Sequence, residues 1–352
     1  MDLWGGVRDR RSNAPWEADT LVLVYSVVKG VAAMTLALLH DRGLLDYDAP
    51  VAEYWPEFAQ GGKGDITVRQ LLAHRAGLAV IDARLDPEIL ADPERLAAVI
   101  ARQVPGWPPG ERHAYHPISL GFYQSELVRR IDPEGRRLGD YLRAEIAAPL
   151  DVECHIGLPA DFPEDRIAPI QSLNPLGAVL HPRALQPRLL AAVAWPTTLT
   201  ARALRNPRLR GPAGMDAPAY RAVEIASSNG ITNARSLVRL YAAFSSPGGP
   251  FGLSPETVAA LAAPFEPPPA GTWDRVFKRN TAFSLGFMKP CRDFDFGSSE
   301  RAFGAPGLGG SFAYADPDLD LTYAYVTNKL GYSVFDEPRE RALRDACLAC
   351  VS

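Results

Sequence analysis

The sequence predicts an α+β protein in which a helical domain is inserted between two halves of a sheet domain. Short strand-like runs gather near both ends of the chain, whereas the apolar spacing typical of helices dominates its middle. We therefore expect one sheet assembled from both termini, with residues 1–60 and 275–352 forming the sheet domain. Residues 61–274 would form the inserted, loop-rich helical domain. A chain of 352 residues is long enough for one large domain or two interleaved ones.

The N-terminal region predicts two strands followed by a buried helix. The strand-like runs are 2–7 (DLWGGV) and 20–25 (TLVLVY). The segment 26–43 reads SVVKGVAAMTLALLHDRG, with apolar residues on every face. A helix of this kind is expected in the interior and not on the surface.

Apolar periodicity predicts six helices in the middle of the chain. They are 66–74, 93–104, 118–131, 138–150, 234–244 and 255–263. Between about 159 and 220 the prolines cluster and the periodicity fades. This predicts a long irregular segment that passes over a site.

The C-terminal region predicts a hairpin and a last helix. The strand-like runs 311–316 and 321–328 are separated by the turn residues 317–320. A cap residue and an early proline at 336–338 then predict a helix that continues to Val351.

Composition and charge make several kinds of partner poor candidates. The chain is 47% hydrophobic and 22% charged, as in an ordinary globular protein, and its net charge is −4. Without a basic run, nucleic acid and anionic membranes are poor partners. No apolar run reaches the ~18 residues of a membrane-spanning helix, and the N-terminal segment shows no signal-peptide pattern. We expect a small-molecule substrate, and the sequence leaves the oligomeric state open.

The cysteines and the sequence motifs bear on location and on cofactors. The four cysteines are scattered, which predicts reduced thiols and a cytoplasmic location. Cys347 and Cys350 have the spacing of a redox pair, but no strand precedes them. The chain lacks G-x-S-x-G, H-E-x-x-H, paired C-x-x-C and Walker motifs, so we expect no metal and no cofactor.

Ser26 and Lys29 are the first candidate catalytic residues. They stand three residues apart at the start of the apolar helix, so their side chains can touch. Burying an unpaired ammonium is costly, so Lys29 needs a partner, a lowered pKa, or both. A hydroxyl beside such an amine is an activated nucleophile. A capping serine with a lysine that reaches water is the alternative.

Tyr115, in the segment 108–122, is a second candidate base for Ser26. A tyrosine serves as a base when cations depress its pKa, and Lys29 would do so if the fold brings the two together. His113 and His116 flank Tyr115 and are either a metal pair or hydrogen-bonding pocket residues.

The segment 304–311 (GAPGLGGS) leads into a predicted strand. Glycines there would allow the backbone to approach a ligand closely, and a strand N–H could polarise a carbonyl. A tight turn with a bulge is the alternative.

These three elements resemble the motifs of the serine β-lactamase and penicillin-binding-protein-like superfamily, particularly its class C-like branch with the family VIII carboxylesterases. The matching motifs are Ser26-x-x-Lys29, Tyr115-His116-Pro117 and Ala305-Pro306-Gly307, with further likeness at 42–58, 66–78 and 227–244. The resemblance covers nearly the whole chain.

The resemblance implies a β-lactamase/transpeptidase-like fold, an antiparallel sheet flanked by helices, with the cleft on the inserted domain. Ser26 would attack an ester or amide carbonyl while Lys29 and Tyr115 share the proton transfers. The backbone N–H groups of Ser26 and Leu308 would form the oxyanion hole. The residues implied in substrate binding are His116, Ala305, Gly307 and Gly309.

Two departures from the family pattern narrow the expected substrate. Pro117 stands where the family often has asparagine, and Ala305 stands where it often has a cationic or hydrogen-bonding residue. Without that anchor for a carboxylate, we expect a serine hydrolase acting on small neutral carboxylic esters through an acyl-enzyme on Ser26. The alternatives are an acyltransferase of the same fold, a β-lactamase or D-amino-acid peptidase, and a catalytically silent binding protein.

Overall fold

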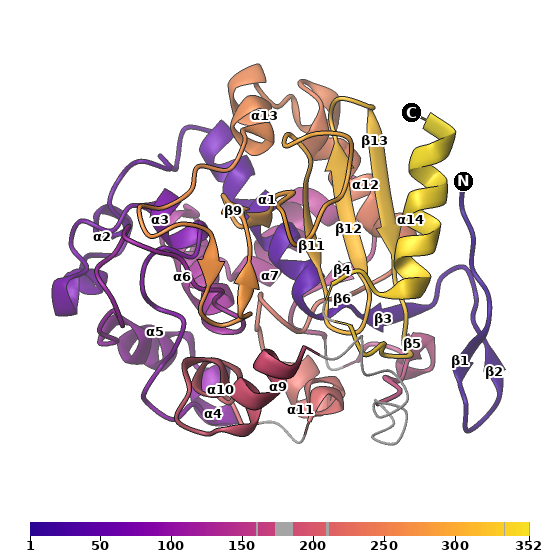
Figure 1. The fold of residues 1–352 in the computed structure, drawn as a ribbon, viewed down its shortest axis with the longest axis horizontal. Helices are drawn as coiled ribbons and strands as arrows, with labels where there is room; N and C mark the ends of the chain where they lie inside the picture. Colours follow the sequence, from indigo (N-terminus) through magenta and orange to yellow (C-terminus); the bar gives the residue numbers. More distant parts are fainter. Residues whose placement is uncertain (160, 173–185, 209–210, 334, 352) are drawn as a thin grey trace.

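The computed structural model describes residues 1–159, 161–172, 186–208, 211–333 and 335–351. Figure 1 shows helices α2–α6 gathered on one side of the protein and strands β11–β13 with helix α14 on the other. The fold is α+β, as predicted from the sequence. Within the described residues, none of the helices combines the length and apolar character needed to cross a membrane.

The helices are α1 (Val28–Asp41), α2 (Val51–Tyr54), α3 (Val68–Leu72), α4 (Pro87–Ala91), α5 (Pro93–Ala101), α6 (Ser119–Ile131), α7 (Leu138–Tyr141), α9 (Pro187–Ala194), α10 (Leu199–Leu204), α11 (Pro218–Arg221), α12 (Ala234–Ser245), α13 (Pro255–Ala262) and α14 (Pro338–Val351). A 3-10 turn, η1 (Tyr25–Val27), precedes α1, and a π-helical segment (Leu142–Ala147) continues α7.

The strands are β1 (Val7–Asp9), β2 (Ala14–Pro15), β3 (Leu21–Leu23), β4 (Cys154–His155), β5 (Ile167–Ala168), β6 (Ile231–Thr232), β7 (Trp273–Asp274), β8 (Arg279–Asn280), β9 (Phe283–Ser284), β10 (Phe287–Met288), β11 (Phe303–Pro306), β12 (Phe312–Asp316) and β13 (Leu321–Tyr325).

The main sheet comes from one stretch of the chain. Its order is β13-β12-β11-β10-β9, and each described pair is antiparallel. The prediction that both termini share this sheet is therefore wrong. Strand β3 joins a separate sheet with the order β4-β6-β3-β5, and the first strand, expected at 2–7, begins at Val7 and pairs with β2. An apolar run such as 20–25 shows that a strand is buried, but not which strand pairs with it.

Strand β12 separates two cores. Ala313 and Ala315 belong to the large core that contains α1. Phe312 and Tyr314 alternate with them and point into an aromatic cluster. That cluster also contacts α14, where Tyr323 of β13 donates a hydrogen bond to the Glu340 carbonyl at 3.1 Å. Helix α12 packs against β12 and β13.

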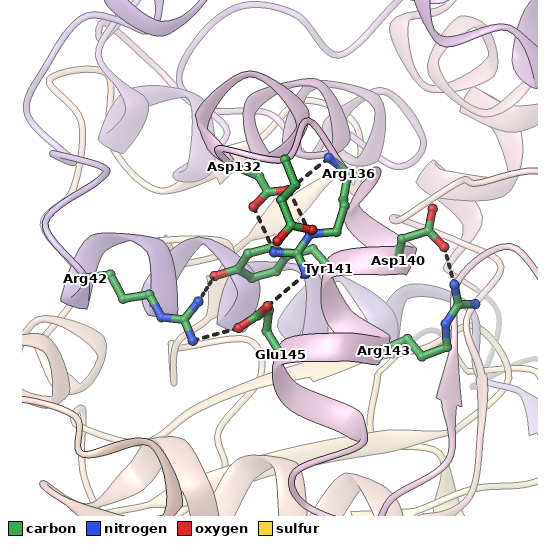
Figure 2. A network of polar contacts seen from close by, with 8 residues as sticks. Arg42, Asp132, Arg136, Asp140, Tyr141, Arg143 and Glu145 are labelled. Carbon is green, nitrogen blue, oxygen red and sulfur yellow. Dashed lines mark hydrogen bonds and ion pairs between the residues drawn. The ribbon is translucent and has the colours of Figure 1, made fainter.

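Helix α1 runs through the interior, because twelve of its fourteen residues are buried. It contacts α6, α7, α13, β10 and β11. Figure 2 shows how the chain beyond its C-terminus is held: Arg42 donates to Tyr141 at 3.0 Å and to Glu145 at 2.9 Å. Glu145 also accepts from Arg136 at 2.8 Å. The end of α1 opposite the candidate nucleophile is therefore fixed to α7 and the π-helical segment after it.

Most predicted helices are confirmed, generally with shorter bounds, although α12 extends one residue further than predicted, to Ser245. The hairpin of β12 and β13 and the last helix are also confirmed. The segment 159–220, expected to be irregular, contains α9 and α10 in its described part, and residues 160, 173–185 and 209–210 lie outside the described residues. The division at 60/61 and 274/275 stays a prediction. Within the range 61–274, α12 covers the sheet and does not belong to the helical side.

Candidate active site

Ser26 lies on a sharp turn between β3 and α1. The preceding residue, Tyr25, has a positive φ of 50°, a conformation that L-residues adopt at a cost. This turn carries Ser26 from the buried strand into η1, where its side chain is half-buried. Ser26 thus sits in the first turn of a helical segment, where backbone N–H groups have no partner within the helix.

Lys29 is buried, and its amine makes three polar contacts. Its Nζ lies 3.1 Å from Ser26 Oγ, and it donates to the carbonyls of Pro117 and Ser227 at 2.7 Å each. Burial lowers the Lys29 pKa well below its ordinary value. A neutral amine has two N–H donors and one lone pair. The two carbonyls take the donors, which leaves the lone pair for the Ser26 hydroxyl.

Tyr115 approaches Ser26 from the loop before α6. Its hydroxyl donates to Ser26 Oγ at 2.7 Å. Its ring stacks on Phe277 and Phe283, with centroid distances of 4.3 and 5.6 Å, and Lys29 Nζ lies 4.8 Å from the ring centroid. Burial, the largest cause, raises the Tyr115 pKa, although the hydrogen bond with Ser26 opposes the shift. Tyr115 therefore keeps its proton, which favours Lys29 of the two candidate bases.

Asp274 holds the Tyr115 loop in place, and the sequence analysis missed it. Its carboxylate accepts from the backbone N–H of Tyr115 at 2.8 Å and of Val276 at 2.7 Å, and from the Thr281 hydroxyl at 3.1 Å. Burial raises the Asp274 pKa to about 6. No feature of the sequence around Asp274 marks it, since its partner in the site, Tyr115, lies 159 residues away along the chain.

Pro117 and Ser227 contribute to the site through their backbone. The departure from asparagine at Pro117 removes a side-chain amide, but the Pro117 carbonyl accepts from Lys29. Ser227 reaches Lys29 because Gly121 of α6 allows close packing: a Cβ at Gly121 would lie 2.3 Å from the Ser227 nitrogen. The sequence analysis assigned Ser227 no role, because a carbonyl acceptor is present at every residue.

The end of β11 passes directly beside the Ser26 turn. A Cβ at Gly307 would lie 2.3 Å from the Val24 carbonyl oxygen and 3.0 Å from Val27 Cγ2, so only glycine fits there. The Gly307 N–H donates to the Ser311 carbonyl at 2.7 Å, which closes the turn that carries Leu308. Ala305, Gly307 and Leu308 line the same cavity as Ser26.

His116, expected to bind substrate, lies outside the cavity lining. Its Nε2 accepts from the Leu78 N–H at 3.1 Å, and its Nδ1 donates to the Ala114 carbonyl at 2.7 Å. The ring is fully buried, burial lowers its pKa to about 3, and it is absent from the cavity lining. His113 instead contacts Thr281, so the two rings have different partners. Gly309 packs on Leu330 and is also absent from the described lining.

The cavity above Ser26 has a volume of about 1010 Å³. Near Ser26 its wall is apolar and aromatic, with Phe277, Phe283 and Met288. Its other walls come from the segment after α3 and from α9 and α10. A cavity of this size accommodates a ligand larger than a short ester.

Comparison with known proteins shows the family to which the chain belongs. Residues 1–348 match the model of the β-lactamase family. The chain is 33% identical to the Esterase/beta-lactamase LipL of Mycobacterium tuberculosis over 94% of its own length and 74% of the relative's. It resembles the crystal structure of a family VIII carboxylesterase with a TM-score of 0.84 at 32% identity, covering 99% of this chain and 88% of that one.

A further solved structure is a penicillin-binding protein homologue from Caulobacter crescentus, with a TM-score of 0.82 at 34% identity over 98% of this chain and 87% of that one. These matches span the sheet and the helical side together. With Ser26, Lys29 and Tyr115 assembled at the base of one cavity, they show that the chain belongs to the β-lactamase family.

Proposed function

We propose that this esterase/β-lactamase-like serine hydrolase cleaves small carboxylic esters through an acyl-enzyme on Ser26. The observation that carries the proposal is the contact of one hydroxyl with both an amine and a phenol. Ser26 Oγ lies 3.1 Å from Lys29 Nζ and 2.7 Å from the Tyr115 hydroxyl, and it opens into the cavity.

In the acylation step, the neutral Lys29 amine takes the proton of Ser26 while Ser26 Oγ bonds to the ester carbonyl carbon. The oxyanion that forms would be held by the N–H groups of Ser26 and Leu308. The Tyr115 hydroxyl donates its proton to the departing alkoxide, and the proton on Lys29 passes back to Tyr115. Water then attacks the acyl-enzyme with the same groups in reverse, which releases the acid and restores Ser26.

We further propose that the ester is neutral in the part that lies against β11. Ala305 lines the cavity with a methyl group, so that position offers no cation or side-chain donor for a carboxylate. A charged hydrogen bond at that position would contribute about 1.5–3 kcal/mol. β-Lactams and D-amino-acid peptides should therefore be poorer substrates than esters.

The unpaired state of all four cysteines supports a cytoplasmic location for the enzyme.

An acyltransferase is the second candidate, favoured by the size of the cavity. About 1010 Å³ leaves room for an acceptor alcohol or amine beside a small acyl group. Adding acceptors to the hydrolysis assay and measuring the transfer product by mass spectrometry distinguishes the two reactions. A transfer product that replaces the free acid would favour the acyltransferase.

A fluorophosphonate probe tests the proposal directly. We expect one covalent adduct per chain, located on Ser26 by peptide mass spectrometry. The Ser26→Ala variant should take up no probe and hydrolyse no p-nitrophenyl butyrate, with an unchanged circular dichroism spectrum. Labelling elsewhere, or retention of more than a few per cent of activity in Ser26→Ala, would refute Ser26 as the nucleophile. An unlabelled, inactive wild-type protein would indicate a silent binding protein.

A further inference from the structure

The outer end of the active-site cavity carries an excess of positive charge. Four arginines line it, namely Arg84, Arg202, Arg205 and Arg208. Among the described lining residues, Asp82 is the single carboxylate. These residues come from the segment before α4 and from α10 and the residues that follow it, and Figure 1 shows α4, α9 and α10 together at one edge of the protein.

Neighbouring side chains do not neutralise this charge. Asp82 is already paired with Arg202 and accepts from Gln103 at 3.0 Å. Arg205 donates to the Val193 carbonyl at 2.9 Å, which leaves its charge in place. Arg84 and Arg208 make no hydrogen bond or ion pair with any described residue, and both are exposed. Three of the four guanidinium groups therefore face the cavity without a carboxylate.

The sequence shows that the undescribed residues cannot supply the missing carboxylate. From 166 to 215 the chain has no aspartate or glutamate, although its net charge is −4. The same stretch contains seven arginines: Arg166, Arg183, Arg188, Arg202, Arg205, Arg208 and Arg210. No carboxylate from this stretch is thus available to Arg202, Arg205 or Arg208. The arginines do not form a run of basic residues, so the stretch stands out by its lack of acidic ones.

We infer that the substrate is an ester that carries an anionic group at the end distant from the scissile bond. This inference rests on the proposed function and refines it. Guanidinium groups bind carboxylates and phosphates by paired, charge-assisted hydrogen bonds. Val80, Ile81 and Ile118 line the cavity with apolar side chains. The ester would place its scissile bond at Ser26, an apolar chain along this wall and its anion at the arginines.

The inference is compatible with Ala305. Ala305 belongs to β11 and would face a carboxylate next to the oxyanion hole. The arginines belong to different elements, the segment before α4 and the region of α10, and would bind a different group of the substrate. A substrate with one negative charge at its far end satisfies both observations.

The experiment compares p-nitrophenyl esters of one chain length that differ at the far end. One is the monoester of suberic acid, the second is its methyl-capped neutral counterpart, and the third ends in a phosphonate. We expect a kcat/KM about five- to tenfold higher for an anionic ester than for the neutral one, mainly through KM, since the arginines are partly hydrated. The suberate and phosphonate arms show which anion is preferred. The preference should shrink at about 0.5 M salt.

The double variant Arg84→Gln/Arg208→Gln should lose most of this preference and keep its activity on the neutral ester. Neither side chain has a structural partner among the described residues, so folding should be unaffected. Arg188→Gln is the matched control, because Arg188 belongs to the same acid-free stretch but is absent from the cavity lining. The control should retain the preference.

Equal kcat/KM values for the anionic and neutral esters would overturn the inference and leave the esterase proposal intact. A double variant that retains the preference would do the same. Failure to cleave any ester, together with no fluorophosphonate labelling, would refute the proposed function itself.

The exposed Leu190, Trp195 and Leu204 lie in the same region. If the double variant lost binding to phosphatidylglycerol vesicles but kept its preference among soluble esters, the arginines would serve a lipid surface and the inference would be wrong.

Discussion

Lys29 is buried and has no carboxylate partner among the described residues. Its three polar neighbours are two backbone carbonyls and a hydroxyl. Carbonyl groups satisfy the N–H donors of an amine without providing the full charge that would hold it protonated. The site therefore prepares a base at the cost of burying a polar group.

This environment predicts the pH dependence of catalysis. Lys29 must be neutral, and its pKa lies well below 10.5, so kcat/KM should fall only as the pH drops through that lowered value. Tyr115 must be protonated, and burial raises its pKa above 10.0, so no alkaline loss is expected up to pH 10. A pH-stat assay with an alkyl ester measures the profile. Activity that keeps rising from pH 9 to 10.5 would show that Lys29 has an ordinary pKa.

The same shift affects stability. Between the lowered pKa and 10.5, the folded protein binds fewer protons at Lys29 than the unfolded chain does. The contribution of Lys29 to the free energy of unfolding should therefore rise with pH across that interval.

Tyr115→Phe separates the hydroxyl of Tyr115 from the packing of its ring. The phenyl ring can still stack on Phe277 and Phe283, so the melting temperature should change little. Loss of the proton donor should lower kcat by about 10²–10⁴-fold. Tyr123→Phe is the control, because it removes another buried hydroxyl, one that donates to the Ile100 carbonyl at 3.4 Å. Activity within about tenfold of the wild type in Tyr115→Phe would make Tyr115 a wall of the pocket.

Strand β11 influences the site through its distance from the Ser26 turn. Gly307 sets that distance, since a methyl group there would overlap the Val24 carbonyl. The antiparallel pairing of β11 with β12 holds the strand from the other side. The position of the Leu308 N–H, a proposed oxyanion donor, thus depends on the packing of a strand against a turn.

Gly307→Ala should push β11 away from the turn. Stabilisation of the oxyanion is sensitive to donor shifts of tenths of an ångström. We therefore expect kcat to fall by about 10²–10³-fold. Gly64→Ala is the matched control, because a Cβ at Gly64 meets nothing within 4 Å. Steady-state kinetics on p-nitrophenyl butyrate compares the two variants. A Gly307→Ala enzyme with normal kcat would argue against Leu308 in the oxyanion hole.

The stability of the whole molecule depends on α1, which packs against both the sheet and the helical side. The interior contacts of α1 and the ion pairs beyond its C-terminus contribute differently to the free energy of unfolding. Leu36 is fully buried, whereas the Arg42 side chain is 41% exposed. Burial of apolar side chains contributes far more than a partly hydrated ion pair.

We therefore expect Leu36→Ala to lower the free energy of unfolding by about 2–5 kcal/mol, and Arg42→Gln by less than about 1 kcal/mol. Urea denaturation followed by tryptophan fluorescence measures both changes. Equal losses in the two variants would mean that the network in Figure 2 contributes as much as the core does.

Local patterns were sufficient to predict part of this protein. Ser26 and Lys29 meet because a spacing of three places two residues on one face of a helix. The β12–β13 hairpin and α14 follow from a short turn and from a capping pattern, and both are interactions between near neighbours. Tyr115 was a candidate base as well, but helical spacing could not place it beside Ser26; the family resemblance implied that contact.

Contacts between distant segments decided the rest. The Pro117 and Ser227 carbonyls reach Lys29 from positions 88 and 198 residues away. Asp274 reaches the Tyr115 N–H across 159 residues. Every residue has a carbonyl and many carboxylates are exposed, so nothing in a single sequence marks the few that the fold buries beside an amine or a loop. The same holds for β3, whose apolar residues require burial but allow several partners, and packing selected β5 and β6.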